Sequence, residues 1–153
     1  MILRAADIEK KQQRHSHPWN PASEIHGVRL AHDAGLKRVG VNVGRVPPGK
    51  ESFVYHVHHV EEEWLYVLSG RAMIDVDGAE HEVAAGDFVA FAPGVAHHLH
   101  NPFDEDVRYL MGGEAIDVEI CDFPTFKKRM VRHGMKTVVY PLDGEAMGPY
   151  PKL

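Results

Sequence analysis

Apolar and polar residues alternate along much of the chain, in short stretches separated by glycine, proline and an Asp-Gly pair. In residues 36–46, for example, Val39, Val41 and Val43 alternate with polar residues or glycine. A period of two places every second side chain on the same face, which is typical of a half-buried strand. The pattern predicts strands at residues 36–46, 53–60, 64–70, 71–76, 79–83, 88–91, 97–101 and 107–111.

The two ends of the chain differ from this central region. Residues 1–35 are expected to form an N-terminal arm, in which residues 6–14 make one or two helical turns. Residues 113–153 are expected to form a C-terminal extension. Within it, the sequence predicts a short helix at residues 126–133 and a strand at residues 136–140.

Many short strands at regular spacing indicate an all-β sandwich or barrel, here at residues 36–112 of a single domain that spans residues 1–153. The hydrophobic content of 44% and the charged content of 25% are typical of a soluble globular protein. The net charge of −5 offers no basic surface for nucleic acid or for an anionic membrane. Cys121 is the single cysteine and the N-terminus lacks the apolar run of a signal peptide, so we expect a cytoplasmic protein.

Three histidines and one glutamate carry the candidate chemistry, namely His56, His58, Glu63 and His97. His56 and His58 are two residues apart on a predicted strand and therefore share a face. Glu63 follows after a short turn, and His97 comes from a second hairpin. Three neutral imidazoles and a carboxylate suit a divalent first-row metal: Mn, Fe, Co, Ni, Cu or Zn. Such a site leaves two neighbouring positions open on an octahedral ion, for water, dioxygen or a chelating substrate.

The segments that carry these residues resemble the two motifs of the cupin superfamily, over residues 36–112. The first motif is matched by Gly49, His56, His58, Glu63 and Gly70. The second is matched by Gly86, Gly94, His97 and Asn101, with Ala92 at the usual proline position and Pro93 beside it. The resemblance implies a small double-stranded β-helix, the jelly-roll barrel of cupins, with short terminal extensions. It also favours a homodimer, since small cupins are commonly dimers.

Glu61 and Glu62 compete with Glu63 for the role of ligand. Glu61 follows His58 too closely for the motif, and Glu62 lacks the six-residue gap to Gly70. Strand parity also places Glu63 on the face opposite to Glu62. Glu63 is therefore the predicted ligand and the candidate catalytic group.

Other histidines have plainer interpretations. His59, His98 and His100 flank the ligands but alternate to the opposite face, so they are expected at the surface or at an interface. His15 and His17 form another H-x-H pair, but no glutamate follows at the right spacing. This pair is expected to lie in a loop.

Trp64, Tyr66 and Leu68 form an apolar row opposite the ligand face. Either the terminal arms or a second subunit could cover this row. Cys121 is expected to be a buried or part-buried thiol. Three arginines on or beside predicted strands are either solvated or able to hold an anionic substrate: Arg45, Arg71 and Arg108.

The resemblance favours a metal-dependent oxidoreductase of the dioxygenase type, acting on a small oxygen-rich molecule, with Glu63 taking a proton. The alternative is an isomerase of a sugar, sugar phosphate or uronate, similar to mannose-6-phosphate isomerases. A further alternative is a sensor that binds a small ligand without turnover. Oxygen uptake would separate the two enzymes, and inward-facing Arg or Lys near the metal would favour a sugar phosphate.

Overall fold

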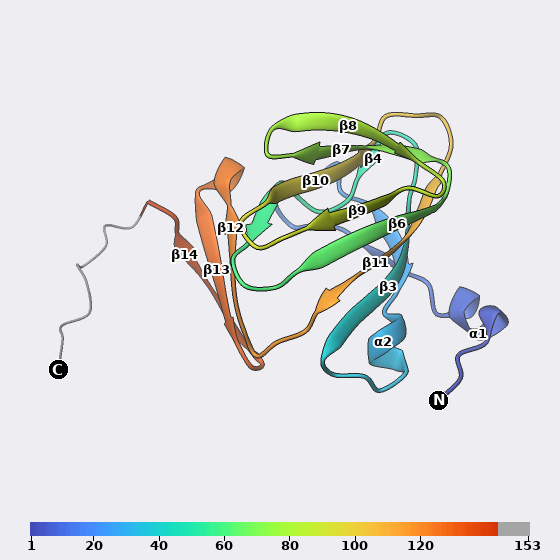
Figure 1. Ribbon diagram of the computed structural model, residues 1–153, viewed down its shortest axis with the longest axis horizontal. Helices are drawn as coiled ribbons and strands as arrows, with labels where there is room; N and C mark the ends of the chain where they lie inside the picture. Colours follow the sequence, from blue (N-terminus) through green and yellow to red (C-terminus); the bar gives the residue numbers. More distant parts are fainter. Residues whose placement is uncertain (144–153) are drawn as a thin grey trace.

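The computed structural model describes residues 1–143, which fold into two antiparallel β-sheets that pack together as a barrel (Figure 1). The first sheet has the strand order β1 (Gln13–His15), β2 (Ile25–Val28), β3 (Val39–Val46), β11 (Val107–Glu114), β6 (Glu63–Ser69) and β9 (Phe88–Phe91). The second sheet has the order β14 (Lys136–Pro141), β13 (Lys128–His133), β12 (Val118–Phe123), β5 (His56–His58), β10 (Ala96–Asn101), β7 (Arg71–Val76) and β8 (Ala79–Ala84), and β4 (Lys50–Glu51) pairs with β10. The helical elements are α1 (Ala5–Lys10), α2 (Leu30–Asp33) and the 3-10 turn η1 (Pro124–Phe126). The all-β jelly-roll prediction is confirmed.

The apolar core lies between the two sheets because alternate side chains of each strand point inward. On β6, Leu65 and Val67 are buried whereas Tyr66 and Leu68 are exposed, which confirms the predicted alternation. Both sheets contribute to the main cluster, which contains Ile25, Val46, Leu65, Val67, Ala72, Ile74, Val83, Phe91, Leu99, Val107 and Tyr109. A smaller cluster of Val54, Cys121 and Phe123 holds β12 against the rest of the barrel.

Gly44 allows the Tyr109 ring to pack closely against strand β3. Tyr109 of β11 pairs with Gly44 of β3 and is only 2% exposed. A Cβ atom at position 44 would lie 2.7 Å from Cζ of the Tyr109 ring, well inside van der Waals contact. The ring therefore occupies space that any other residue at position 44 would fill.

The N-terminal residues extend the first sheet. The predicted helical turns are present as α1, but the sequence pattern did not indicate β1 or β2. Ile25 and Val28 of β2 are buried, and β2 pairs with β3 through Gly27 and Gly44. The predicted strand at residues 53–60 is shorter than expected, because only β5 takes part in pairing there.

The predicted helix at residues 126–133 is wrong. Most of that segment is β13, which pairs along its whole length with β12 on one side and β14 on the other. This pairing satisfies the backbone groups that a helix would satisfy internally. The predicted strand at residues 136–140 is confirmed as β14, whereas residues 144–153 lie outside the described part of the chain.

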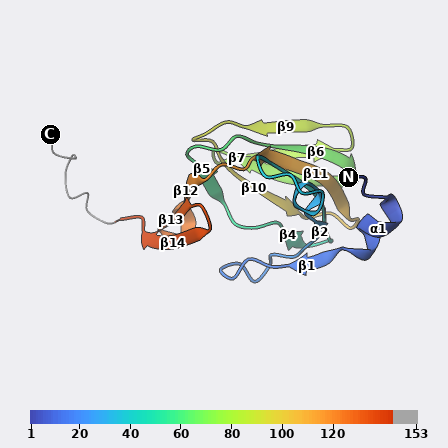
Figure 2. The same cartoon turned by 90° about the horizontal axis from the view of Figure 1, so that it is seen from below.

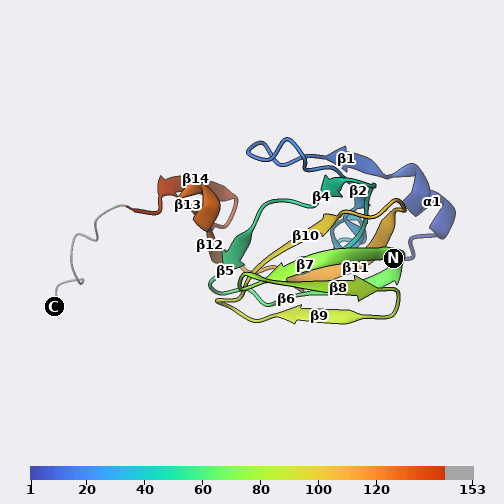
Figure 3. The same ribbon diagram turned by 90° about the horizontal axis from the view of Figure 1, so that it is seen from above.

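Figures 2 and 3 show β13 and β14 projecting beyond the barrel on the side of β5 and β12, with α1 on the opposite side. The C-terminal hairpin thus borders the end of the barrel to which β5 contributes. None of the helices within residues 1–143 has the length and the apolar character needed to cross a membrane.

Candidate metal centre

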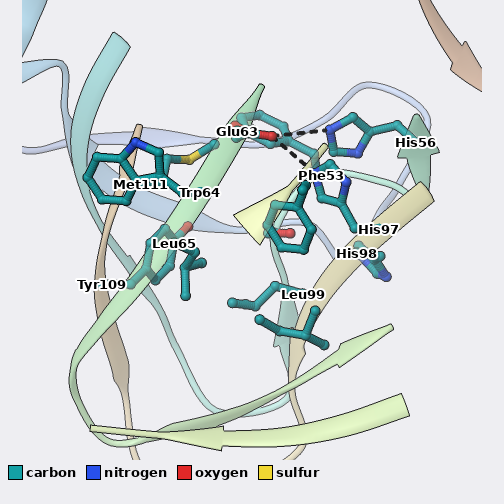
Figure 4. Close-up of a pocket in the computed structure, with 13 residues that line it drawn as sticks. Phe53, His56, Glu63, Trp64, Leu65, His97, His98, Leu99, Tyr109 and Met111 are labelled. Atoms are coloured by element: carbon teal, nitrogen blue, oxygen red, sulfur yellow. Dashed lines mark hydrogen bonds and ion pairs between the residues drawn. The ribbon is translucent and has the colours of Figure 1, made fainter. Parts of the chain in front are cut away.

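The four predicted ligands meet where β5 pairs with β10. His56 and His58 are on β5, Glu63 is the first residue of β6, and His97 of β10 lies directly opposite His56. Their potential ligand atoms all lie within 4.8 Å of one another. Figure 4 shows Glu63, His56 and His97 pointing toward one another. The cluster could hold a single metal ion.

The hydrogen bonds of two rings leave their Nε2 atoms free to bind a cation. Nδ1 of His56 lies 2.7 Å from the Val54 carbonyl oxygen, and Nδ1 of His97 lies 3.1 Å from that of Val95. Because a carbonyl only accepts, Nδ1 donates in both cases and Nε2 of the neutral ring carries the lone pair. These Nε2 atoms lie 4.0 and 3.0 Å from Oε2 of Glu63, respectively. A proton on Nε2 of His97 would make the 3.0 Å contact a hydrogen bond, whereas in the neutral ring with Nδ1–H a metal ion between Nε2 and the carboxylate would satisfy both, so the donor set fits a divalent metal.

A buried carboxylate stands behind the third imidazole. Nε2 of His58 lies 3.6 Å from Oε2 of Glu63. Its Nδ1 is buried without a hydrogen-bond partner among the described residues, 3.8 Å from Oε2 of the fully buried Glu119. The distance of 3.8 Å is too long for a hydrogen bond, but a carboxylate on the Nδ1 side favours the proton on that nitrogen and leaves Nε2 to face Glu63. His58 is therefore also arranged to bind through Nε2.

Burial and neighbouring side chains keep His56 neutral and Glu63 ionised near neutral pH. Burial, together with the neighbouring imidazoles of His97 and His58, lowers the pKa of His56 to about 3. Burial alone would raise the pKa of Glu63, but the three imidazoles outweigh it and hold that pKa below its usual value. Metal ligands must be deprotonated to bind, so these shifts favour metal binding.

Glu119 also holds the loop between the second and third ligands, residues 59–62. Its Oε1 accepts the backbone N–H groups of His59 and Ile120, at 3.2 and 2.8 Å. Its Oε2 accepts the backbone N–H of Glu61 at 2.7 Å. A carboxylate that accepts several backbone N–H bonds is well satisfied although buried. One side chain thus connects the loop to the position of His58.

The carboxylates next to Glu63 have other partners. Glu61 is 7% exposed, lies 2.5 Å from Nη2 of Arg132 and accepts the backbone N–H of Ile116. Glu61, Glu119 and His58 are close enough to form a second ligand group, but Arg132 and the backbone donors already occupy these carboxylates. Glu62 is exposed. The carboxylate within the four-residue cluster is Glu63, as strand parity predicted.

A cavity of about 250 Å³ leads to the cluster. Its walls consist of three ligands, a further histidine, a cysteine and four apolar side chains: His17, Phe53, His56, His58, Glu63, Met111, Cys121, Phe123 and Met130. Burial and the nearby carboxylates of Glu119 and Asp122 raise the pKa of Cys121 to about 12, so this thiol stays protonated. The cavity is therefore largely apolar, with its polar groups gathered around the cluster.

The histidines that flank the ligands lie outside the four-residue cluster, but only His59 is at the surface as expected, whereas His100 is half-buried and the side chain of His98 is only 15% exposed. His59 lies 2.8 Å from a carboxylate oxygen of Asp122. His98 and His100 have carboxylates of Glu51 and Glu80 nearby, each at 3.5 Å.

The three candidate arginines do not line the metal cavity. Arg45 pairs with Asp106 at 2.8 Å, Arg71 has Glu82 at 3.4 Å, and Arg108 is exposed. Sequence reasoning missed two residues that the structure brings to the site, His17 and Glu119. For Glu119 a signal was present, because it shares strand parity with two apolar residues, Cys121 and Phe123. For His17 only its tertiary position shows the connection.

The fold and the site together define a jelly-roll barrel protein with three histidines and a glutamate that could hold a metal ion beside a cavity. The family model for the cupin domain matches residues 42–113, which contain all four residues of the cluster. The chain belongs to the cupin superfamily, whose members generally bind metals.

Similarity to solved structures extends beyond the barrel. A candidate sugar phosphate isomerase from Acidithiobacillus ferrooxidans is 30% identical, with a TM-score of 0.91 and coverage of 97% of both chains. A sugar phosphate isomerase of the cupin superfamily from Silicibacter pomeroyi is 24% identical, with a TM-score of 0.80 and coverage of 92% of this chain and 94% of that one. This second likeness shows the fold alone.

Among curated sequences, an uncharacterized protein of Methanocaldococcus jannaschii is 27% identical over 81 residues, or 53% of this chain. The match spans 57% of that relative's own length.

Proposed function

We propose that this cupin is a metal-dependent isomerase that interconverts the aldehyde and ketone forms of a small sugar or sugar phosphate. The observation that carries the proposal is the full-length similarity to a candidate sugar phosphate isomerase, at 30% identity and 97% coverage of both chains. That similarity includes the terminal segments that form walls of the metal cavity, at His17 and at Cys121 to Met130. The similarity therefore extends over the segments that form the cavity walls as well as over the barrel.

The reaction class is compatible with the side chains of the cavity. Aldose–ketose isomerisation moves hydrogen from the hydroxyl-bearing carbon to the carbonyl carbon, and from the hydroxyl oxygen to the carbonyl oxygen, so no oxidant is consumed. A bound divalent ion supplies Lewis-acid polarisation of the substrate oxygens. His56, His58, Glu63 and His97 would hold that ion, and the Glu63 carboxylate is the predicted carrier of the proton. The apolar walls exclude water from the reacting carbons.

The charge of the cavity bears on where a phosphate could bind. Of the described residues that line the 250 Å³ cavity, none is Lys or Arg. An adjoining cavity of about 220 Å³ shares Phe53 and Met111 with it and has Arg29 in its wall. These positions support a hydroxycarbonyl group at the ion, with any phosphate farther away and toward Arg29.

The dioxygenase that the sequence first favoured would use the same ligands, and it differs in consuming oxygen. The test loads the protein with each of the six candidate metals and supplies aldoses and ketoses, with and without a terminal phosphate, in D₂O. Proton NMR should detect the isomer together with deuterium at the exchanged carbon, and an oxygen electrode should record no uptake. Oxygen consumption with an enol or diketone would support the dioxygenase instead, and binding without any turnover would support a sensor.

A matched pair of variants separates the site from general effects on strand β10. His97→Gln should abolish isomerisation and reduce metal content, because it removes one of the four ligands. His100→Gln changes an imidazole on the same strand that lies outside the cluster, so it should retain both properties.

The proposal includes a cytoplasmic homodimer. Tyr66 is 39% exposed, Leu68 is 44% exposed, and Phe88 on the adjacent edge strand β9 is 61% exposed. The N-terminal residues do not bury this apolar strip of Tyr66, Leu68 and Phe88. A second subunit that packs on the strip would remove apolar surface from water.

A further inference from the structure

His17 is the one residue of the N-terminal segment that lines the metal cavity. It is 39 positions before the first ligand in the sequence, outside both motifs. Its ring packs among three aromatic side chains, with centroids 5.1 Å from Trp19, 6.2 Å from Phe53 and 5.9 Å from Phe123. Phe123 in turn stacks on the ligand His56 at 6.3 Å. An aromatic cluster thus connects His17 to the metal centre.

A backbone hydrogen bond fixes the tautomer of this imidazole. The backbone N–H of Trp19 donates to Nδ1 of His17 at 3.3 Å, so the neutral ring carries its proton on Nε2. Burial lowers the pKa of His17, which favours that neutral form. Nε2 makes no hydrogen bond with any residue in the described part of the chain. His17 therefore has one unused N–H donor.

The segment that carries His17 is anchored to the barrel at several points. Its backbone N–H donates to Oγ of Ser23 at 2.9 Å, and that hydroxyl donates to the carbonyl of Ser52. The Asn20 amide donates to Glu51 and to the carbonyl of Phe53, at 2.7 and 2.8 Å. A donor held by such contacts loses little further conformational freedom when a ligand binds.

We propose that His17 is a substrate-binding residue, whose Nε2–H donates a hydrogen bond to an oxygen of the molecule bound at the metal centre. The inference rests on the proposed function for the identity of that molecule, a hydroxycarbonyl compound. In the isomerase reaction, negative charge develops on the substrate oxygens when the proton leaves carbon. A pre-positioned donor stabilises such charge more than it stabilises the neutral substrate. No atom is transferred to or from the imidazole in this role.

The experiment uses acetohydroxamate, a bidentate oxygen chelator that resembles an enediolate, and the full-length protein loaded with cobalt. The variant His17→Phe keeps a ring among the aromatic side chains and removes the donor. The control His32→Phe makes the same change elsewhere in the N-terminal residues, at an exposed position that lines neither the metal cavity nor the adjoining one. Cobalt content, the thermal midpoint and the acetohydroxamate dissociation constant are measured for each protein.

We expect His17→Phe to bind acetohydroxamate about tenfold more weakly, which corresponds to the loss of one hydrogen bond. Cobalt content should stay at the wild-type level, and His32→Phe should match wild type in all three measurements. Unchanged affinity in His17→Phe, or an equal loss in His32→Phe, would overturn the proposal.

A second measurement needs no variant. In the zinc-loaded wild-type protein, the NMR signals of the His17 ring should report an Nε2–H tautomer, and the ¹H and ¹⁵N signals of that group should shift when acetohydroxamate is added. An Nδ1–H tautomer, or a signal that does not respond, would overturn the proposal even where His17→Phe fails to fold. Both measurements are independent of turnover, so a failed isomerase assay beside a positive binding result would reject only the proposed reaction.

Discussion

The substitution Glu119→Gln tests whether a carboxylate outside the four ligands controls metal binding. The two oxygens of Glu119 serve different groups. Oε1 accepts two backbone N–H groups, whereas Oε2 accepts one from Glu61 and faces Nδ1 of His58 at 3.8 Å. Glutamine keeps the size of the side chain but replaces one acceptor with an NH₂ donor. Its carbonyl oxygen should take the place of Oε1, where two donors meet.

The NH₂ group would then face the N–H of Glu61 and Nδ1 of His58. A buried N–H without an acceptor costs about 1–3 kcal/mol, so the free energy of unfolding should fall by about 2 kcal/mol. The amide would also donate to Nδ1 of His58 and move the ring proton to Nε2, the atom that should bind the metal. Loss of such an outer carboxylate typically weakens metal binding by about 10–100-fold.

Urea unfolding of the metal-free protein measures the first effect, and a competition titration with zinc and a chromogenic chelator measures the second. The control is Glu114→Gln, because Glu114 is exposed and its side chain accepts, within residues 1–143, only the backbone N–H of Glu62, at 3.3 Å. It should leave both quantities near wild type. A Glu119→Gln protein with reduced stability and unchanged zinc affinity would refute the argument about His58, and a protein unchanged in both would refute the whole account.

Three further predictions follow from other parts of the structure. The metal-free protein should lose stability as the pH falls from about 6.5 toward 3, by up to about 1.4 kcal/mol per pH unit. The reason is that burial lowers the pKa of His56 to about 3, so between these pH values the His56 imidazole is protonated in the unfolded chain but not in the folded protein. Urea unfolding at several pH values between 7 and 4 measures the effect, and a free energy of unfolding that stays constant would contradict it. Gly44→Ala should destabilise the protein by about 1–3 kcal/mol in thermal unfolding, because its Cβ would lie 2.7 Å from the Tyr109 ring, and an unchanged thermal midpoint would show that the ring moves aside freely. Light scattering should give twice the chain mass for wild type and a lower mass for the double variant Leu68→Glu, Phe88→Glu; a monomeric wild type would reject the dimer.

The strands and three of the four candidate ligands were predictable from local spacing, whereas the jelly-roll barrel and the place of His97 came from the resemblance to the cupin motifs. Alternation with a period of two gives the strands and their inward faces, as Leu65 and Val67 show. The same periodicity places His56 and His58 on one face of β5 and separates Glu63 from Glu62. These relations hold within a few residues of one another, so no tertiary information is needed to state them.

The terminal segments were harder to predict because their structure depends on distant partners. The charged residues of β13 read as a possible helix, but Arg129 pairs with Asp122 across the adjoining strands and Arg132 reaches Glu61, 71 positions away. His17 has no spacing relation to the ligands, and only the anchoring of its segment on residues 51–53 brings it to the cavity. Pairing of this kind overrides local propensity.

The four residues of the cluster and several walls of the cavity come from different parts of the chain. The family match at residues 42–113 contains the four ligands, yet the cavity walls at His17, Cys121, Phe123 and Met130 all lie outside it. A cupin that shares only residues 42–113 with this chain can therefore share the four-residue cluster and still have different cavity walls, as expected when one fold hosts many functions. The candidate isomerase from Acidithiobacillus ferrooxidans is informative for another reason: its similarity spans 97% of this chain and so includes these walls. Exchanging residues 13–24 and 121–130 with the corresponding segments of another cupin, which keeps Glu119 and Arg132 in place, should therefore change which substrate is accepted and leave metal content unchanged.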